Sequence, residues 1–384
     1  MSVNEFEALR AANERGVEAV LETLSQQLRA RKKYHELFEA LKMQLRRRLG
    51  LPLLYSDSGD DLNEERRKQL EDGLIDACRE VGLLLLDEGR VREGWMYLRP
   101  VGDKKAAAEL LAKIPADEEN TEELVDVCLR EGVDVERGFQ LVLKNHGTCN
   151  AITTFEGEMP RHPRREQQIA ARLLVKHLYD ELSANLKADI ARQEGSPPQE
   201  QTLRDLSADR PWLFQELSYH VDTTHLASVI RFARVLEDAE SLRLALDMTE
   251  YGRRLHKQFQ YQGDEPFTAI YPSHALFFQA LLGENVDAAL AYFRERADAC
   301  EPRSQGTSAI EVYVDLLGRL GRYGEAIDAA IRLTPDGTQS QGLAPSLLEL
   351  CQQAGNYDRL LTYCRERDDL LGFAAGLVKA NRGD

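Results

Sequence analysis

The sequence predicts an all-α fold, built as a right-handed array of helical hairpins with an irregular middle segment. Apolar residues recur at steps of three and four through most of the 384 residues, as on one face of a helix. A short phrase, Gly-x-(Tyr or Val)-x-x-small residue, recurs between such patterns at Gly89–Trp95, Gly321–Ile327 and Gly355–Leu361, with a looser copy at Gly283–Leu290. The glycine is expected to end one helix in the left-handed conformation, and the small residue to let the next helix cross closely.

The first 63 residues are expected to form a long helix followed by a loop. From about residue 4 to residue 49 the helical pattern is continuous, and leucines recur along it at Leu21, Leu24, Leu28, Leu37, Leu41 and Leu45. Gly50 and Pro52 end this pattern. Residues 51–63 are rich in Asp, Ser and Gly, which is typical of a loop.

A basic stretch lies within this N-terminal segment. Between Arg29 and Arg48 the chain carries eight Lys or Arg against two Glu. The simpler interpretation is a solvated helix face that pairs with acidic residues elsewhere in the chain. The alternative is an arm that docks an acidic partner.

Residues 64–145 are expected to form further helical hairpins, because residues 131–139 repeat the pattern of 88–95 with one residue inserted. Regularity then fails in residues 146–211, which begin with turn formers and β-branched residues where a helix would be needed. A helix at about 165–192 and a polar Gly-Ser-Pro-Pro linker follow. We therefore predict an irregular, histidine-rich middle segment with a flexible linker.

Residues 212–384 return to regular helical pairs, with breaks near 262–273, 301–307 and 334–345. Tyr323 and Tyr357 occupy equivalent places 34 residues apart, a period that suits a two-helix repeat.

At Gly321-Arg-Tyr-Gly-Glu-Ala-Ile327 the chain resembles the tetratricopeptide (TPR) family, whose second helix begins with a similar Gly-x-Tyr-x-x-Ala phrase. Val286 and Tyr357 stand in the place of Tyr323 in the neighbouring copies. The resemblance covers roughly the last 110 residues. It implies a helical-repeat α-solenoid that binds a protein or peptide on a concave surface, although no dicarboxylate clamp of that family maps onto this chain.

Composition narrows the classes of function. A formal net charge of -16 and a pI near 5.1 argue against nucleic acid or an anionic membrane as partner, since both need clustered positive charge. The N-terminus has no export signal, and the longest apolar run, residues 81–86, is far too short to span a bilayer. The six cysteines lie singly along the chain. A soluble protein of the reducing cytoplasm fits these features best.

A metal site is the first hypothesis for chemistry, because five of the eight histidines lie between residues 146 and 225. His177 and Glu181 are four residues apart, and Glu216 and His220 repeat that spacing. Residues i and i+4 share a face of a helix, so two facing helices would bring two imidazoles and two carboxylates together. Such ligands suit a divalent zinc, manganese or iron ion. Ordinary surface pairs at the same spacing are the alternative interpretation.

A catalytic site is the second hypothesis, and it rests on Asn145-His-Gly-Thr-Cys149. His146 would lower the pKa of the Cys149 thiol and make it a nucleophile. The alternative is a helix end, with His146 near the carboxyl pole and Gly147 as the cap. His225 is a further candidate acid or base if the chain breaks near Asp222, since five residues would otherwise rotate it about 140° from His220.

Two functions therefore follow from the sequence. The first is a cytoplasmic helical-repeat scaffold or adaptor that binds a protein or peptide. The second is a metal-dependent enzyme of hydrolase or lyase type, with His177, Glu181, Glu216 and His220 as ligands. The sequence leaves open whether any reaction is catalysed.

Overall fold

The computed structural model describes residues 3–53, 62–335, 338 and 340–382. The chain forms two compact units, residues 1–150 and residues 151–384. Within the described residues the regular elements are helices, and extended backbone pairs once, in an isolated bridge between Gln262 and Ala269. The prediction of an all-α fold is confirmed. No helix in this part of the chain has the length and apolar character needed to cross a membrane.

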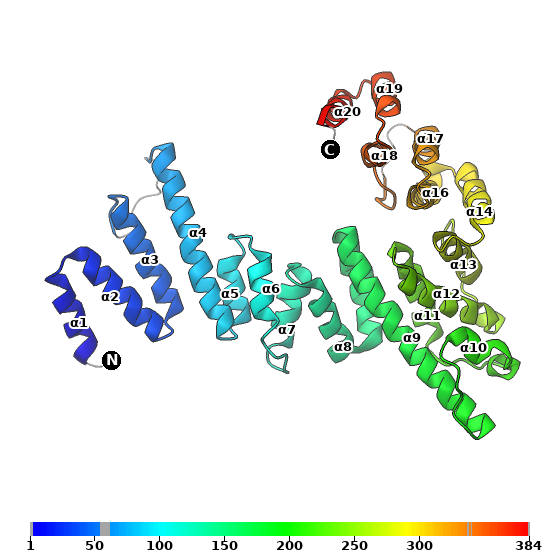
Figure 1. Ribbon diagram of the computed structural model, residues 1–384, viewed down its shortest axis with the longest axis horizontal. Coiled ribbons are helices and arrows are strands. Elements are labelled where there is room, and N and C mark those ends of the chain that lie inside the picture. Colours follow the sequence, from blue (N-terminus) through cyan, green and yellow to red (C-terminus); the bar gives the residue numbers. More distant parts are fainter. Residues whose placement is uncertain (1–2, 54–61, 336–337, 339, 383–384) are drawn as a thin grey trace. The chain divides into compact units, whose positions relative to one another are not determined.

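The first unit is a succession of helices in which neighbours along the chain pack on one another (Figure 1). Its elements are α1 (Val3–Asn13), α2 (Val17–Ala30), α3 (Tyr34–Arg48), α4 (Glu64–Asp87), α5 (Val91–Leu98), α6 (Lys104–Leu111), α7 (Thr121–Val125), the π-helical turn η1 (Asp126–Arg130), and α8 (Val135–Glu158), which continues past residue 150.

The expectation of one long N-terminal helix is wrong. The helical pattern is divided among α1, α2 and α3, because Gly16 has φ 107° and Lys32 has φ 55°, both outside the range of a right-handed helix. The two turns fold the pattern back, so that α1 packs on α2 and α2 on α3. The loop expected at 51–63 lies partly outside the described residues, which resume at 62.

The basic stretch pairs with carboxylates of its own unit, as the simpler interpretation predicted. Arg31 reaches Glu5 at 2.9 Å and Arg47 reaches Glu18 at 3.0 Å. Further pairs join this stretch to α4 and to the residue that follows it: Arg29 to Glu80, and Lys32 to Glu88. Its positive charge is therefore largely balanced within the unit.

The recurring glycine phrase marks the hairpin turns. Gly89, between α4 and α5, has φ 77°. In the same phrase a Cβ atom on Gly94 would lie 2.7 Å from the Leu86 side chain and 3.0 Å from the Gly82 carbonyl oxygen. Only a residue without a side chain permits this close crossing of α4 and α5, so both roles expected of the phrase are confirmed here.

The second unit contains the remaining elements, again mostly packed on their neighbours in the chain (Figure 1). They are η2 (Met159–Arg161), α9 (Arg164–Glu194), α10 (Leu203–Ala208), η3 (Pro211–Phe214), α11 (Thr223–Phe232), η4 (Ala233–Val235), α12 (Ala239–Arg254), η5 (Lys257–Phe259), α13 (Ile270–Leu281), α14 (Val286–Ala299), α15 (Pro302–Gln305), α16 (Ser308–Arg319), α17 (Tyr323–Leu333), α18 (Leu347–Ala354), α19 (Asp358–Glu366) and α20 (Leu370–Arg382).

The middle of the chain is more helical than expected. Helix α8 runs to Glu158 through a single non-helical residue, Gly147, with φ 81° and ψ 175°. Helix α9 then covers the helix expected at 165–192 and is 31 residues long. Turn formers and β-branched residues in 148–158 are accommodated in the second half of α8, so the expected irregular connection is reduced to a break at Gly147 and a short turn before α9.

Regular hairpins follow in the C-terminal part of the second unit. Gly283, Gly321 and Gly355 all have positive φ, as expected of residues that end the first helix of a pair. The pairs are α13 with α14, α16 with α17, and α18 with α19. The second helix of each pair also packs on the next first helix: α14 on α16, α17 on α18, and α19 on α20.

Candidate functional site

One of the two expected metal-binding pairs lies on a helix. His177 and Glu181 occupy successive turns of α9 and share its face. Their side chains are each about two-fifths exposed, and His177 Nε2 lies 4.0 Å from Glu181 Oε2. This pair has the geometry of an ordinary exposed i, i+4 contact.

The other expected pair does not lie on a helix, which corrects the argument from spacing. Glu216 and His220 belong to the segment between η3 and α11, and Glu216 has φ 57°. A four-residue step brings two side chains onto one face only where the helix is continuous. Pro211 instead opens a short 3-10 turn that ends at Phe214.

The His220 side chain is buried between α9 and α12. Its Nε2 lies 3.1 Å from Asp189 Oδ2 on α9, and its Nδ1 lies 2.9 Å from the Tyr251 hydroxyl on α12. The His220 backbone N–H also donates to the Tyr251 hydroxyl at 3.0 Å, and Asn185 donates to the His220 carbonyl oxygen at 2.8 Å. These contacts attach the segment before α11 to α9 and α12.

The four expected ligands are therefore not gathered into one set. Among the described residues, no three His, Cys, Asp or Glu side chains are grouped so that they could hold a metal ion. Both ring nitrogens of His220 already face Asp189 and Tyr251, partners 31 residues away on either side. No local pattern in the sequence identifies those partners.

Of the three expected catalytic residues, His146 and Cys149 belong to the first unit and His225 to the second. His146 Nε2 is 3.0 Å from Glu122 Oε1 on α7, at the end of the first half of α8. The positive φ of Gly147 supports the helix-cap interpretation of this sequence. Cys149 is exposed just beyond the break. His225, in the second unit, lies in the first turn of α11, where its backbone N–H donates to Asp222 Oδ1 at 3.2 Å.

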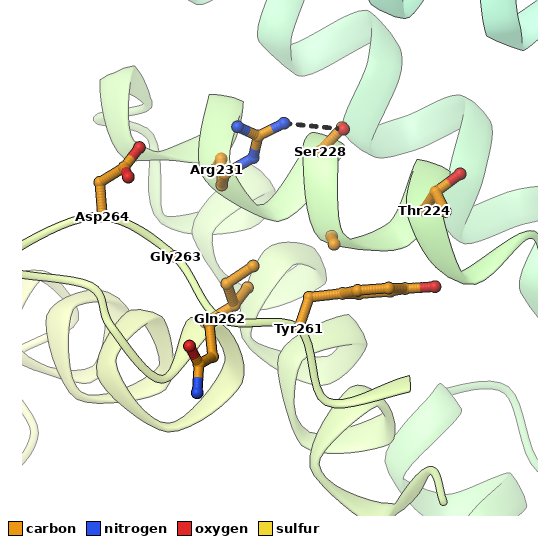
Figure 2. A pocket seen from close by; sticks show the side chains of 9 residues that line it. Thr224, Ser228, Arg231, Tyr261, Gln262, Gly263 and Asp264 are labelled. Atoms are coloured by element: carbon orange, nitrogen blue, oxygen red, sulfur yellow. Dashed lines mark hydrogen bonds between the residues drawn. The ribbon is translucent and has the colours of Figure 1, made fainter. Parts of the chain in front are cut away.

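A small cavity of about 280 Å³ lies between α11 and residues 261–264 of the second unit (Figure 2). Thr224, Ser228 and Arg231 line it from α11, because steps of four and three residues place them on one helix face. Tyr261 lines it from the opposite segment, as Figure 2 shows.

Several of the polar groups around this cavity already have partners. The Arg231 guanidinium donates to Ser228 Oγ at 3.0 Å and to Glu156 Oε1 at 2.9 Å. The Tyr261 hydroxyl shares a hydrogen bond with Thr223 Oγ1 at 2.7 Å. A ligand here would compete with these contacts within the chain.

A larger cavity of about 400 Å³ lies along the first helices of the C-terminal hairpins, and we call it the α16 groove. Leu281 of α13, Gly318 of α16 and Gln353 of α18 line it. Arg164, at the start of α9, and Tyr323, at the start of α17, also line it. The remaining lining residues are Glu237, Asp315, Arg319 and Pro345. Four separate hairpin elements and α9 thus contribute to one groove.

A buried ion pair network forms one wall of the α16 groove. Asp315 is 6% exposed, and the Arg164 Nη2 atom lies 3.0 Å from its Oδ1. Arg319 Nη1 lies 3.6 Å from Asp315 Oδ2 and donates to the Arg234 carbonyl oxygen at 2.7 Å. Arg319 also donates to the Leu236 carbonyl oxygen. Burial lowers the pKa of Arg319, and the neighbouring Asp315 opposes that shift.

A second buried carboxylate organises the rim of the groove. Glu311, one turn before Asp315 on α16, accepts a hydrogen bond from Thr307 Oγ1 at 2.5 Å. It also accepts from the backbone N–H groups of Gln341 and Leu343, both at 2.8 Å. The loop before α18 is thereby attached to α16.

The sequence carries a signal for part of this network. Glu311, Asp315 and Arg319 follow one another at four-residue steps, so they share one face of a helix that is otherwise almost entirely apolar. Charged residues in an apolar helical run are expected to be paired. Arg164, which is 151 residues from Asp315, has no such signal.

Comparison with known proteins does not assign the chain to a family. The sequence matches no protein-family model and no curated protein, and the fold matches no solved structure.

Proposed function

We propose that this chain is a helical-repeat scaffold or adaptor that binds a peptide segment of a partner protein in the α16 groove. The observation that carries the proposal is the composition of that groove. Residues of α13, α16 and α18 line it together, and the paired side chains of Asp315 and Arg164 form part of its wall. The charged side chains of Arg164, Glu237, Asp315 and Arg319 line it beside Leu281, Pro345 and the Tyr323 ring. Polar groups that are fixed in position next to apolar ones are suited to orienting a ligand.

The buried network favours recognition over chemistry. Arg164 and Arg319 both contact Asp315, Glu237 Oε1 lies 3.7 Å from Arg164 Nε, and Arg319 is further held by two carbonyl oxygens. Such groups are fixed in position, and they offer a peptide backbone both a donor and an acceptor. The exposed side chain of Gln353 and the half-buried Tyr323 ring add contacts at the opening.

The repeated hairpins supply the second line of support. Each second helix packs on the next first helix, so that successive first helices form neighbouring parts of one surface. We extend the proposal to an α-solenoid arrangement of the TPR type for these hairpins. All six cysteines are free, which suits a reducing compartment, and we therefore place the scaffold in the cytoplasm.

The experiment is a selection of peptides from a displayed library against the full chain, followed by affinity measurement on two variants. Gln353→Trp fills the groove, and Gln352→Trp, its exposed neighbour on α18 that does not line the groove, is the matched control. We expect Gln353→Trp to weaken binding by roughly tenfold or more, and Gln352→Trp to leave it unchanged.

Two results would contradict the proposal. One is the failure to select any peptide with saturable binding to the folded chain. The other is a set of peptides whose affinity is the same for wild type and Gln353→Trp. Fluorescence anisotropy of labelled peptides measures both, and circular dichroism of each variant verifies that the helices are intact.

A further inference from the structure

The cavity between α11 and residues 261–264 is lined by two side chains of opposite charge that do not pair with each other. Arg231 lines it from α11, and Asp264 lines it from the loop before α13. Figure 2 shows both side chains to the left of the Tyr261 ring. In the described part of the chain no ion pair joins Arg231 to Asp264. The cavity therefore offers a cation and an anion to a ligand.

Arg231 has hydrogen-bond donors that no protein group uses. Its contacts with Ser228 and Glu156 are both made through one nitrogen, Nη2. Its Nη1 and Nε atoms donate to no acceptor among the described residues, and Figure 2 shows the second terminal nitrogen on the side of Asp264. Free N–H groups of a guanidinium are suited to binding a carboxylate. Glu156 competes for this arginine only through a well-exposed pair, and such pairs are weak.

The Asp264 carboxylate is exposed and has no direct partner. It accepts no hydrogen bond and forms no ion pair within the described residues. At longer range it opposes the lowering of the Arg234 pKa that burial causes. An ionised carboxylate of this kind is suited to accepting hydrogen bonds from a ligand ammonium group.

The size of the cavity and its apolar wall restrict the ligand further. A volume of about 280 Å³ is just below the range of roughly 300–1,000 Å³ that is typical of drug-sized ligands, so the cavity suits a smaller molecule. Ala227, Ile270 and the Tyr261 ring form an apolar part of the wall. A peptide would carry its two terminal charges at distant ends. A free amino acid carries both charges beside a single side chain.

We propose that this cavity binds a free α-amino acid with an aliphatic side chain. Arg231 binds its carboxylate, Asp264 binds its ammonium group, and the side chain lies against the Tyr261 ring and Ile270. The bound ligand thereby links α11 to the loop before α13. This site shares no lining residue with the α16 groove, and it does not depend on the function proposed for that groove.

The first test is isothermal titration of the full chain with L-alanine, L-valine and L-leucine. At least one of them is expected to bind saturably at one site per chain. Isocaproic acid, which is leucine without its amino group, and isoamylamine, which is leucine without its carboxyl group, are the matched ligands. Both are expected to bind at least roughly tenfold more weakly than leucine, because each leaves one charged group of the cavity without its partner.

The second test removes each charge of the cavity in turn. Asp264→Asn is expected to raise the dissociation constant for the amino acid roughly tenfold or more, and to reduce the preference for leucine over isocaproic acid. Glu265→Gln is the matched control, because this neighbouring carboxylate contacts Arg296 at 2.9 Å and does not line the cavity. Arg231→Gln should weaken binding as Asp264→Asn does. Its control, Glu156→Gln, removes the competing pair and keeps the arginine.

Three results would overturn the proposal. One is the absence of saturable binding for all three amino acids. Another is an affinity for leucine no higher than that for isocaproic acid or isoamylamine. The third is an affinity that Asp264→Asn and Arg231→Gln leave unchanged, or that Glu265→Gln lowers as much as Asp264→Asn does. Circular dichroism of each variant separates these results from loss of folding.

Discussion

In the first unit the arginines of α2 and α3 meet carboxylates near the surface, whereas in the second unit Asp315 and Arg319 meet inside the protein. The Arg29 and Glu80 side chains remain about two-fifths exposed, while those of Asp315 and Arg319 are 8% and 10% exposed. Water screens the first kind of pair and is excluded from the second. Loss of an arginine–carboxylate pair should therefore lower the free energy of unfolding much more inside the second unit than at the surface of the first.

The difference has a structural origin. Helix α16 is flanked by α14 on one side and α17 on the other, so it is buried on nearly every face, including that of Glu311 and Asp315. A buried charge must be paired and hydrogen-bonded, and α16 meets this need through Arg164, Arg319 and the loop before α18. The basic stretch of α2 and α3 lies on helices with one face in solvent, where pairing is optional.

The largest effect is expected from breaking the buried network. Arg319→Met leaves Asp315 without one cation and two carbonyl oxygens without donors. We expect the second unit to lose about 3–5 kcal/mol of unfolding free energy, measured by urea denaturation. Arg322→Met removes an exposed pair with Glu325 from the neighbouring turn and is the control. Equal losses in the two variants would contradict the comparison.

A smaller effect is expected at the rim of the groove. Glu311→Ala removes the acceptor for the backbone N–H groups of Gln341 and Leu343. We expect a loss of about 1–3 kcal/mol, since those donors and Thr307 lose their partner. Hydrogen exchange should accelerate at the Gln341 and Leu343 amides before it does in α16 itself. Unchanged exchange at both amides would show that Glu311 does not hold the loop.

The next prediction concerns the contribution of Glu93, in the first unit, to stability, and this contribution depends on pH. Arg90 and His35, which hydrogen-bond to Glu93, lower the pKa of that carboxyl from 4.5 to about 2. A carboxyl with a depressed pKa in the folded state contributes stability above its unfolded pKa and loses it as pH falls through the folded value. The contribution should therefore be complete above pH 4.5 and disappear towards pH 2.

Glu93→Gln tests this contribution. The variant should be less stable than wild type at pH 7, and the difference should shrink as the pH falls from 4.5 to 2. Helical circular dichroism in a fixed amount of urea measures it. Because Glu93 is about two-fifths exposed, we expect the difference to be well below that of Arg319→Met. A difference that stays constant over this pH range would contradict the role assigned to Arg90 and His35.

The smallest effect is expected from the exposed pair between α2 and α4. Arg29→Met should cost less than about 1 kcal/mol, and moderate salt should reduce even this difference. Urea denaturation of wild type and variant at low and high salt measures it. A loss as large as that of Arg319→Met would mean that exposure does not decide the value of these pairs.

The hairpin turns were predictable because their causes are local. Gly89, Gly321 and Gly355 end helices with positive φ as the recurring phrase indicated, since glycine alone adopts that conformation without strain. The division of the N-terminal pattern at Lys32 was not predictable in this way. Lysine rarely adopts a positive φ, and the turn follows from the packing of α2 on α3.

The candidate sites, too, could be predicted only where their causes are local. The spacing of Glu216 and His220 is that of a helix, yet the chain there is not helical, so the expected ligand set does not form. The partners that His220 does have, Asp189 and Tyr251, come from α9 and α12. Contacts between residues far apart in the chain depend on how helices pack. The spacing of residues within one segment does not predict that packing.

What the sequence by itself determined is the helical character of the chain and the turns at the recurring glycine phrase, because apolar periodicity and glycine conformation act over a few residues. Only the tertiary structure decided which faces are covered. Asp315 is buried because helices lie on both sides of α16. Leu371 is exposed because the helices on which α20 packs, α18 and α19, leave its side of α20 uncovered. Whether a side chain is buried depends on which helices pack against it, and that packing involves residues far apart in the sequence.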